Sequence, residues 1–314
     1  MPRTRKQRDP AKENGGAPRI TKQPGYRGKP GPRGKPGFRG KPGFRGKIAK
    51  IPRLASIEGT AVAPALKYDA SVLIDSAALP WEPFSPAGYA EGIRMRVLRR
   101  LDDGTLRSAI LDVPAGWSSG AALAGRVAEQ GYVLSGVLQV GGRRLEAGSF
   151  YFHPAGAASG PVSSKAGVRV IAIFEGAQSY KLAYGPTANA PAAVADTAIE
   201  HLVAEEVPPF EPVIGGKKIG VRRRVLWEDP VTGADTRHLT LPAGLSGLGA
   251  EWHPVNEEIF CLGRDPGPVN EGDLQAGWYL FNPAFAVHGG HRREQPCDMT
   301  LLEWHDGKWE LNRI

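Results

Sequence analysis

"LQAGWYLFNPAFAVHG", residues 274–289, contains a glycine, five mainly apolar residues, a proline, four further residues and a histidine. Earlier in the chain, "LEAGSFYFHPAGAASG", residues 145–160, repeats the pattern with the glycine and the proline in register. Short apolar runs bounded by Gly and Pro are typical of β-strands and their turns. The two stretches therefore predict one β unit that the chain uses twice.

The repeat extends well beyond these two stretches. An offset of 128 residues places "GIRMRVLRR", residues 92–100, on "GVRRRVLWE", residues 220–228, and it also pairs Glu129 with Glu257. Matched glycines, prolines and a glutamate at nearly constant offset indicate a duplicated domain. We expect an all-β protein.

The predicted domains occupy residues 68–176 and residues 207–314, and each has the short, regularly spaced strands of a sandwich or barrel. Helical periodicity is scarce. The best helical pattern, "AVADTAIEHLVAEE" at residues 193–206, predicts a helical linker between the two domains.

Residues 1–53 differ from the rest, with 17 lysines and arginines against two acids, Asp9 and Glu13. Glycine recurs at every third position from Gly25 to Gly46, the period of collagen. The run is short and its like charges repel, so a disordered basic tail is the favoured interpretation. A collagen-type trimer and weak binding of a polyanion such as nucleic acid remain alternatives.

The remaining 261 residues carry 30 acids and 23 lysines and arginines, so the body is mildly acidic. Two cysteines, Cys261 and Cys297, are too few for a disulfide framework. The chain shows no apolar run of membrane-spanning length and no apolar signal segment. These features predict a cytoplasmic protein without a membrane partner.

Glu251, His253 and Glu257 stand at even offsets within "AEWHPVNEEIF", residues 250–260. In one extended strand, residues at even offsets share a face. Two carboxylates and an imidazole on one inward face would be unfavourable in an apolar core. The pattern predicts either a metal site or a charged strand that faces water.

These residues resemble the motifs of the cupin superfamily, in the two-barrel bicupin arrangement. Gly277, Pro283 and His288 match the second cupin motif in full. In the first motif, His253 and Glu257 match, whereas Glu251 replaces the first histidine. The resemblance implies two tandem jelly-roll, or double-stranded β-helix, barrels.

The same motif positions in the N-terminal copy read Leu123, Gly125, Glu129 and Ser159. Leucine, glycine and serine cannot together hold a transition metal. The resemblance thus implies an N-terminal barrel without a metal, in which Glu129 has a structural role.

In the C-terminal copy, the resemblance implies that His253, Glu257 and His288 hold a divalent transition metal. Two imidazoles and a carboxylate suit Fe²⁺ and are also used by Zn²⁺ and Mn²⁺. Glu251 would be either a fourth ligand or a catalytic base beside the metal. The alternative is a decayed site whose carboxylates are solvated at the barrel mouth.

The resemblance implies a metal-dependent, dioxygenase-like enzyme acting on a small oxygen-rich or enolisable substrate. The alternative is a non-catalytic cupin that senses a metal or small ligand, as in anti-sigma factors. The expected partner is a small molecule, and a homodimer remains open. His238 and His305, on predicted strands, could also line the C-terminal cavity.

Overall fold

The fold is known from a computed structural model that describes residues 65–183, 197–214, 216–247, 249–263, 267–269, 272–290 and 293–314. These residues belong to one compact unit, Ala61–Ile314. Within the described residues the structure is strands and one 3₁₀ turn, which confirms the predicted all-β class. No helix in this described part is long and apolar enough to cross a membrane. The predicted disordered tail, residues 1–53, lies outside the described residues.

The strands before the first barrel, within it and after it run in chain order as follows: β1 (Val72–Asp75), β2 (Glu82–Pro83), β3 (Arg94–Arg100), β4 (Leu106–Val113), β5 (Trp117–Ser118), β6 (Leu123–Gly125), β7 (Glu129–Val140), β8 (Arg143–Glu146), β9 (Ser149–His153), β10 (Ala158–Ser159), β11 (Val162–Ser164), β12 (Val168–Phe174) and β13 (Tyr180–Leu182).

The second half follows with β14 (Ile199–Val203), the 3₁₀ turn η1 (Ala204–Glu206), β15 (Val213–Ile214), β16 (Lys217–Lys218), β17 (Arg222–Glu228), β18 (Asp235–Leu241), β19 (Glu251–Trp252), β20 (Glu257–Cys261), β21 (Gly267–Val269), β22 (Gly272–Leu274), β23 (Trp278–Asn282), β24 (Met299–His305) and β25 (Asn312–Arg313).

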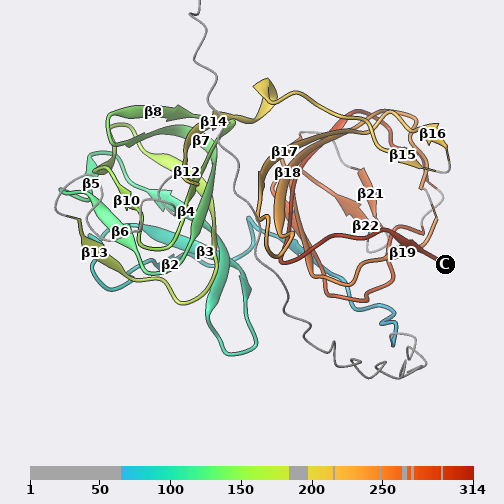
Figure 1. The fold of residues 1–314 in the computed structure, drawn as a ribbon, viewed down its shortest axis with the longest axis horizontal. Coiled ribbons are helices and arrows are strands. Elements are labelled where there is room, and N and C mark those ends of the chain that lie inside the picture. Colours follow the sequence, from blue (N-terminus) through green and yellow to red (C-terminus); the bar gives the residue numbers. More distant parts are fainter. Residues whose placement is uncertain are drawn as a thin grey trace, which may run out of the picture. The chain divides into compact units, whose positions relative to one another are not determined.

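The two halves build their main sheets in the same order. The first has the path β14-β9-β7-β12-β4-β3, and the second has β1-β23-β20-β24-β18-β17. Figure 1 shows the green strands of the first half in one barrel and the orange strands of the second half in another. Because equivalent strands occupy equivalent places, the duplicated barrel predicted from the repeat is present.

One strand of each half pairs with the other half. β1 precedes the first barrel but pairs with β23 of the second, from Val72 opposite Phe281 to Asp75 opposite Trp278. β14 precedes the second barrel but pairs with β9 of the first. The hydrogen-bonded barrels are therefore not the two unbroken sequence ranges that the repeat suggested.

The helix predicted over residues 193–206 is wrong for its described part. Residues 193–196 lie outside the described residues, while Ile199–Val203 is a strand and Ala204–Glu206 is a single 3₁₀ turn. β9 pairs with β7 along one edge and with β14 along the other. Hydrogen bonding to β9 outweighs the weak helical preference of a short segment.

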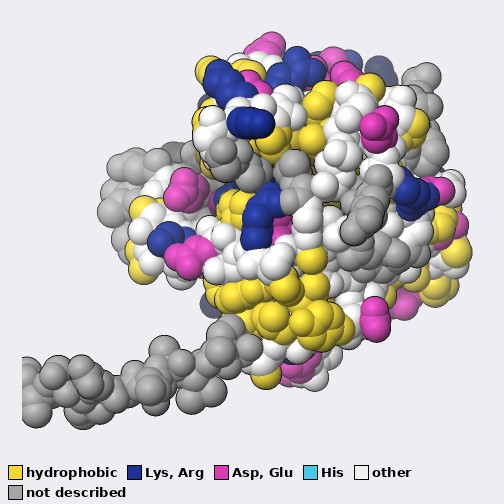
Figure 2. Space-filling model, turned by 90° about the vertical axis from the view of Figure 1, so that its right-hand side faces the viewer, with side chains coloured by type: hydrophobic (Ala, Val, Ile, Leu, Met, Phe, Trp, Pro, Cys, Tyr) yellow, Lys and Arg dark blue, Asp and Glu magenta, His cyan; other side chains and the backbone are white. Residues whose placement is uncertain are grey.

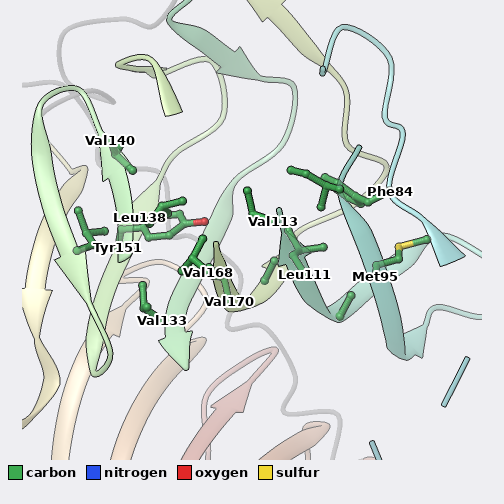
Figure 3. Packing of buried hydrophobic residues seen from close by; sticks show 14 of the residues in the cluster. Phe84, Met95, Leu111, Val113, Val133, Leu138, Val140, Tyr151, Val168 and Val170 are labelled. Carbon is green, nitrogen blue, oxygen red and sulfur yellow. The ribbon is translucent and has the colours of Figure 1, made fainter. Parts of the chain in front are cut away.

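The apolar core has three parts. One fills the first barrel and includes Phe84, Leu111, Val133 and Phe174; Figure 3 shows how several of its side chains converge from facing strands. A second fills the second barrel around Leu280. The third part joins side chains of both halves. Full burial of one such side chain contributes about 1.5–3 kcal/mol, so all three parts stabilise the fold.

The third cluster contains Ile110 and Tyr132 from the first half and Phe260 and Trp304 from the second. Because strand side chains alternate faces, each sheet turns one set of residues into its own barrel and the next set toward the other half. This explains why β4 and β20 are buried on both faces.

Polar contacts between the halves follow the repeat. Ser108 Oγ donates a hydrogen bond of 2.7 Å to Glu258 Oε2. Thr236 Oγ1 donates one of 2.5 Å to Gln130 Oε1. Both donors and both acceptors are related by the same offset of 128 residues. The two halves therefore meet through equivalent surfaces.

Charged side chains of both signs are interspersed on the face that Figure 2 shows, with a hydrophobic patch among them. Interspersed charges of both signs are ordinary for the surface of a protein domain.

Candidate metal centre in the C-terminal barrel

The stretch predicted as one strand over residues 250–260 is interrupted. β19 ends at Trp252 and β20 begins at Glu257, with a turn between them. Glu251, His253 and Glu257 therefore do not converge through simple alternation along a strand. The turn brings His253 back toward the barrel interior, where it is 2% exposed.

The glycine and proline of the second motif have clear local roles. Gly277 opens β23 with a φ of +79°, which favours a residue without Cβ. Pro283 starts the turn after β23, where its carbonyl accepts the Ala286 N–H at 2.9 Å. The chain then returns as an antiparallel bridge between His288 and Glu251. This bridge places the two side chains next to each other.

The three predicted metal ligands do meet. His253 Nε2 lies 3.1 Å from His288 Nε2. Glu257 Oε1 lies 3.6 Å from His253 Nε2, and Glu257 Oε2 lies 3.3 Å from His288 Nε2. Glu251 joins the two histidines in a group whose potential ligand atoms all lie within 4.8 Å of one another. All four predicted site residues are therefore neighbours.

Backbone carbonyls orient both imidazole rings. His253 Nδ1 lies 2.9 Å from the Glu310 carbonyl oxygen, and His288 Nδ1 lies 3.0 Å from the Ala286 carbonyl oxygen. A carbonyl only accepts, so each Nδ1 carries the proton and each Nε2 presents its lone pair when the ring is neutral. Two facing lone pairs at 3.1 Å repel, and either a proton on His288 Nε2 or a bound cation removes this repulsion. The arrangement fits a metal ion.

The pKa values in the group diverge. Burial lowers the pKa of His288, but its hydrogen bond and attraction to Glu257 prevail and raise it to about 9. Burial lowers the pKa of His253 below its usual range. Burial and the nearby charge of Glu257 raise the pKa of Glu251. A carboxyl whose pKa is raised in this way is suited to take up a proton.

A second acidic group adjoins the first. His305 Nε2 lies 3.3 Å from Glu257 Oε1, and His305 Nδ1 lies 2.7 Å from Asp235 Oδ1. Glu257, Glu303 and His305 also offer ligand atoms within 4.8 Å of one another. Arg237 bonds Asp235 and lies 3.8 Å from Glu303 Oε2. Glu257 therefore links the two groups, with Oε2 toward His288 and Oε1 between His253 and His305.

Sequence reasoning missed Glu303, Asp235 and Arg237, and it left His305 undecided. The cupin motifs do not include these positions. A signal was nevertheless present, because β18 and β24 each carry polar residues at alternate positions, Asp235 with Arg237 and Glu303 with His305. Polar residues alternating within apolar strands indicate a polar inner face.

A cavity of about 180 Å³ opens beside the candidate metal ligands. Its polar lining includes Glu251, Glu257 and His288. Its remaining walls are largely apolar and include the following side chains: Val221, Leu239, Leu241, Ile259, Leu274, Leu280, Met299 and Leu301. The arrangement has room for a small molecule next to a bound cation.

The first barrel replaces this polar centre with apolar groups. Leu123 pairs with Ser159, as Glu251 pairs with His288. Opposite Glu129 stands Phe174, whereas opposite Glu257 stands His305. A Cβ at Gly125 would lie 2.8 Å from the Gln178 side chain, so no larger residue fits there unless Gln178 moves.

The Glu129 carboxylate accepts hydrogen bonds from Tyr151, Tyr180 and Gln178. Burial raises its pKa despite these hydrogen bonds. Among the described residues, both groups that could hold a metal lie in the second half of the chain. The structural role of Glu129 stays a prediction.

Comparisons with known proteins give a family for this chain and solved structures with a similar fold. Residues 108–302 match the family described as "Domain of unknown function (DUF4437)". No curated protein matches the chain. Among solved structures, the chain is similar to a candidate dioxygenase from Nostoc punctiforme PCC 73102, with 18% identity, 77% of this chain and 82% of that chain covered, and a TM-score of 0.66.

It is also similar to a candidate glyoxylate-induced protein from Pseudomonas aeruginosa, with 16% identity, 81% and 94% coverage, and a TM-score of 0.55. A third similarity is to Bacillus subtilis oxalate decarboxylase, with 13% identity, 82% and 81% coverage, and a TM-score of 0.49. At such low identities the likeness concerns the fold. The chain belongs to the DUF4437 family, and the bicupin fold indicated by its two motif copies is confirmed.

Proposed function

We propose that this protein is a metal-dependent enzyme with dioxygenase-like chemistry, whose reaction takes place in the C-terminal barrel. The observation that carries the proposal is the meeting of two imidazole Nε2 atoms 3.1 Å apart, both oriented by backbone carbonyls and both beside Glu257. His253, Glu257 and His288 would hold Fe²⁺, Mn²⁺ or Zn²⁺. The bound ion would polarise substrate oxygens and lower the pKa of a substrate proton.

The cavity supports a catalytic rather than purely structural ion. A structural zinc site is closed by four protein ligands. Here the His288, Glu257 and Glu251 side chains line a cavity of about 180 Å³. Its apolar walls would exclude water and hold the hydrocarbon part of a small enolisable substrate such as a diketone.

Glu251 is the proposed catalytic base. Its carboxylate borders both the main cavity and an adjoining one of about 140 Å³. Burial raises the pKa of Glu251 above its usual range, which makes the carboxylate a better proton acceptor. Arg313 Nη2, 3.8 Å from Glu251 Oε2, would steady the carboxylate at the side of the cavity.

Oxygen uptake by the protein loaded with Fe²⁺, measured over a panel of β-diketones and 2-oxo acids, tests the proposal. We expect turnover of at least one enolisable compound. Glu251→Gln should retain the metal but lower kcat by about 10²–10⁴-fold, because it removes a proton acceptor without emptying the site. Glu310→Gln is the matched control, since His253 uses only the backbone carbonyl of that residue.

A metal that binds tightly without turnover of any compound in the panel would contradict the enzymatic proposal. That result would favour the alternative, a cupin that senses a metal or a small ligand. Equal activity of Glu251→Gln and the unchanged protein would contradict the role given to Glu251 alone.

A further inference from the structure

Three arginines surround one tryptophan on the outer face of the first barrel. The guanidinium carbons of Arg96, Arg94 and Arg169 lie 4.4, 5.3 and 5.7 Å from the centroid of the Trp81 ring. The sheet register explains the gathering, because Asp112 on β4 stands between Arg94 on β3 and Arg169 on β12. The indole face holds guanidinium groups by cation–π attraction.

Positive charge exceeds negative charge in this cluster. Asp112 Oδ2 accepts from Arg94 Nη2 at 2.6 Å, and Asp112 Oδ1 accepts from Arg169 Nε at 3.2 Å. Arg96 forms no ion pair with any described residue, and its buried Nε has no hydrogen-bond partner among them. One carboxylate thus faces three guanidinium groups.

A cavity of about 400 Å³ adjoins the cluster and is lined by Trp81, Arg96 and Arg169. Its described lining includes the apolar residues Ile110 and Phe260 and contains no Asp or Glu. One side of the cavity therefore offers unpaired positive charge, and the other offers apolar surface.

We propose that this cavity binds a small organic anion, a carboxylate or a phosphate monoester with an apolar or aromatic body. Guanidinium groups bind both head groups through paired charge-assisted hydrogen bonds. The anion contacts Arg96 and Arg169, and its body packs against Trp81 and Ile110. The site is separate from the acid-rich centre of the C-terminal barrel, whose charge suits a cation.

Isothermal titration calorimetry on the full-length protein tests the proposal with three probes. Benzoate and phenyl phosphate carry the two head groups on one body, and benzamide is the neutral isostere of benzoate. We expect saturable binding of benzoate, phenyl phosphate or both, and at least about 10-fold weaker binding of benzamide, because charged hydrogen bonds are lost. The stronger of the two anions identifies the preferred head group.

Arg96→Gln and Arg169→Gln locate the site. Each should weaken anion binding by at least about 10-fold. Arg169 is exposed, so its variant should fold even if Arg96→Gln does not. Arg144→Gln is the matched control, because it removes the same charge from an exposed arginine that pairs with Glu146 and does not line the cavity.

The proposal is wrong if neither anion binds saturably, or if benzamide binds as tightly as the anions. It is also wrong if Arg144→Gln lowers the affinity as much as Arg96→Gln and Arg169→Gln do. That pattern would show general attraction of anions to a basic chain.

Discussion

At the scale of single residues, Glu257 is the centre of the candidate site. Its Oε2 lies 3.3 Å from His288 Nε2, and its Oε1 lies 3.3 Å from His305 Nε2. Burial raises the pKa of Glu257, but the hydrogen bonds from His288 and His305 reverse this and hold it well below its usual range. A carboxylate that remains charged in a buried position is suited to bind a cation.

The His305 side chain should tune metal affinity without being a ligand in the proposed set. His305→Phe copies the residue that the first barrel has opposite Glu129. Asp235 loses its bond to His305 in this variant but keeps its ion pair with Arg237. Loss of the contact that orients Glu257 should weaken metal binding by about 10–100-fold. Competition with a chromophoric chelator measures the change. Unaltered affinity would show that His305 does not position Glu257.

At the scale of single elements, adjacent residues of β20 serve two regions. Glu257 faces the barrel interior, while Glu258 faces the first half, where Arg99 Nη1 lies 2.9 Å and Arg107 Nε lies 3.4 Å from Glu258 Oε1. Tyr279 also donates to Glu258. The alternation of a strand thus separates a candidate functional carboxylate from a structural one.

Replacing Glu258 by Gln should destabilise the protein by about 3 kcal/mol at neutral pH. Half-buried Arg99 loses its counter-charge, whereas buried Arg107 keeps only its ion pair with Glu175. Urea unfolding measures the change. Ser135→Ala, a substitution at an exposed position of β7 that removes no ion pair, is the control.

The same substitution has a predicted pH dependence. Burial raises the pKa of Glu258, but the charges of Arg107 and Arg99 outweigh this and hold it below its ordinary value of 4.5. A depressed folded-state pKa contributes stability that is present above 4.5 and lost as the pH falls through the folded-state value. The stability difference between the unchanged protein and Glu258→Gln should therefore shrink below pH 4.5. A constant difference would contradict this account.

Much of the element order was predictable, because paired glycines and prolines in the two copies mark equivalent turns. The exchange of β1 and β14 was not, since the same edge position of either barrel accepts the same short strand. The sequence pattern of these two short strands does not indicate which barrel each of them joins. The segment around Ile199 was predicted as helix because its apolar spacing fits a helix, and only the partner strand decides otherwise.

For the candidate site, motif spacing predicted Glu251, His253, Glu257 and His288. It could not identify Glu303 or Asp235, which approach from β24 and β18 through sheet register rather than through local spacing. Long-range pairing is the information that short motifs lack. Contacts of this kind determine which polar residues share an interior.

At the scale of the whole molecule, two copies of one barrel have diverged in their interiors while keeping their mutual contacts. Arg237 pairs with Glu303 in the second barrel, where Ala109 pairs with Ala172 in the first. By contrast, Ser108 with Glu258 and Thr236 with Gln130 retain equivalent hydrogen bonds between the halves. One copy has an interior suited to a cation, and the other has an apolar interior around Glu129.

Metal stoichiometry tests this central claim most directly. Anaerobic titration of the metal-stripped, full-length protein with Fe²⁺, Mn²⁺ and Zn²⁺, followed by calorimetry, should give one tight equivalent per chain. His253→Ala and His288→Ala should each abolish that binding, while circular dichroism shows that the β fold is retained. Tyr151→Phe, beside Glu129 in the first barrel, should leave it unchanged. Two tight equivalents, or tight binding that survives the loss of either histidine, would contradict the account.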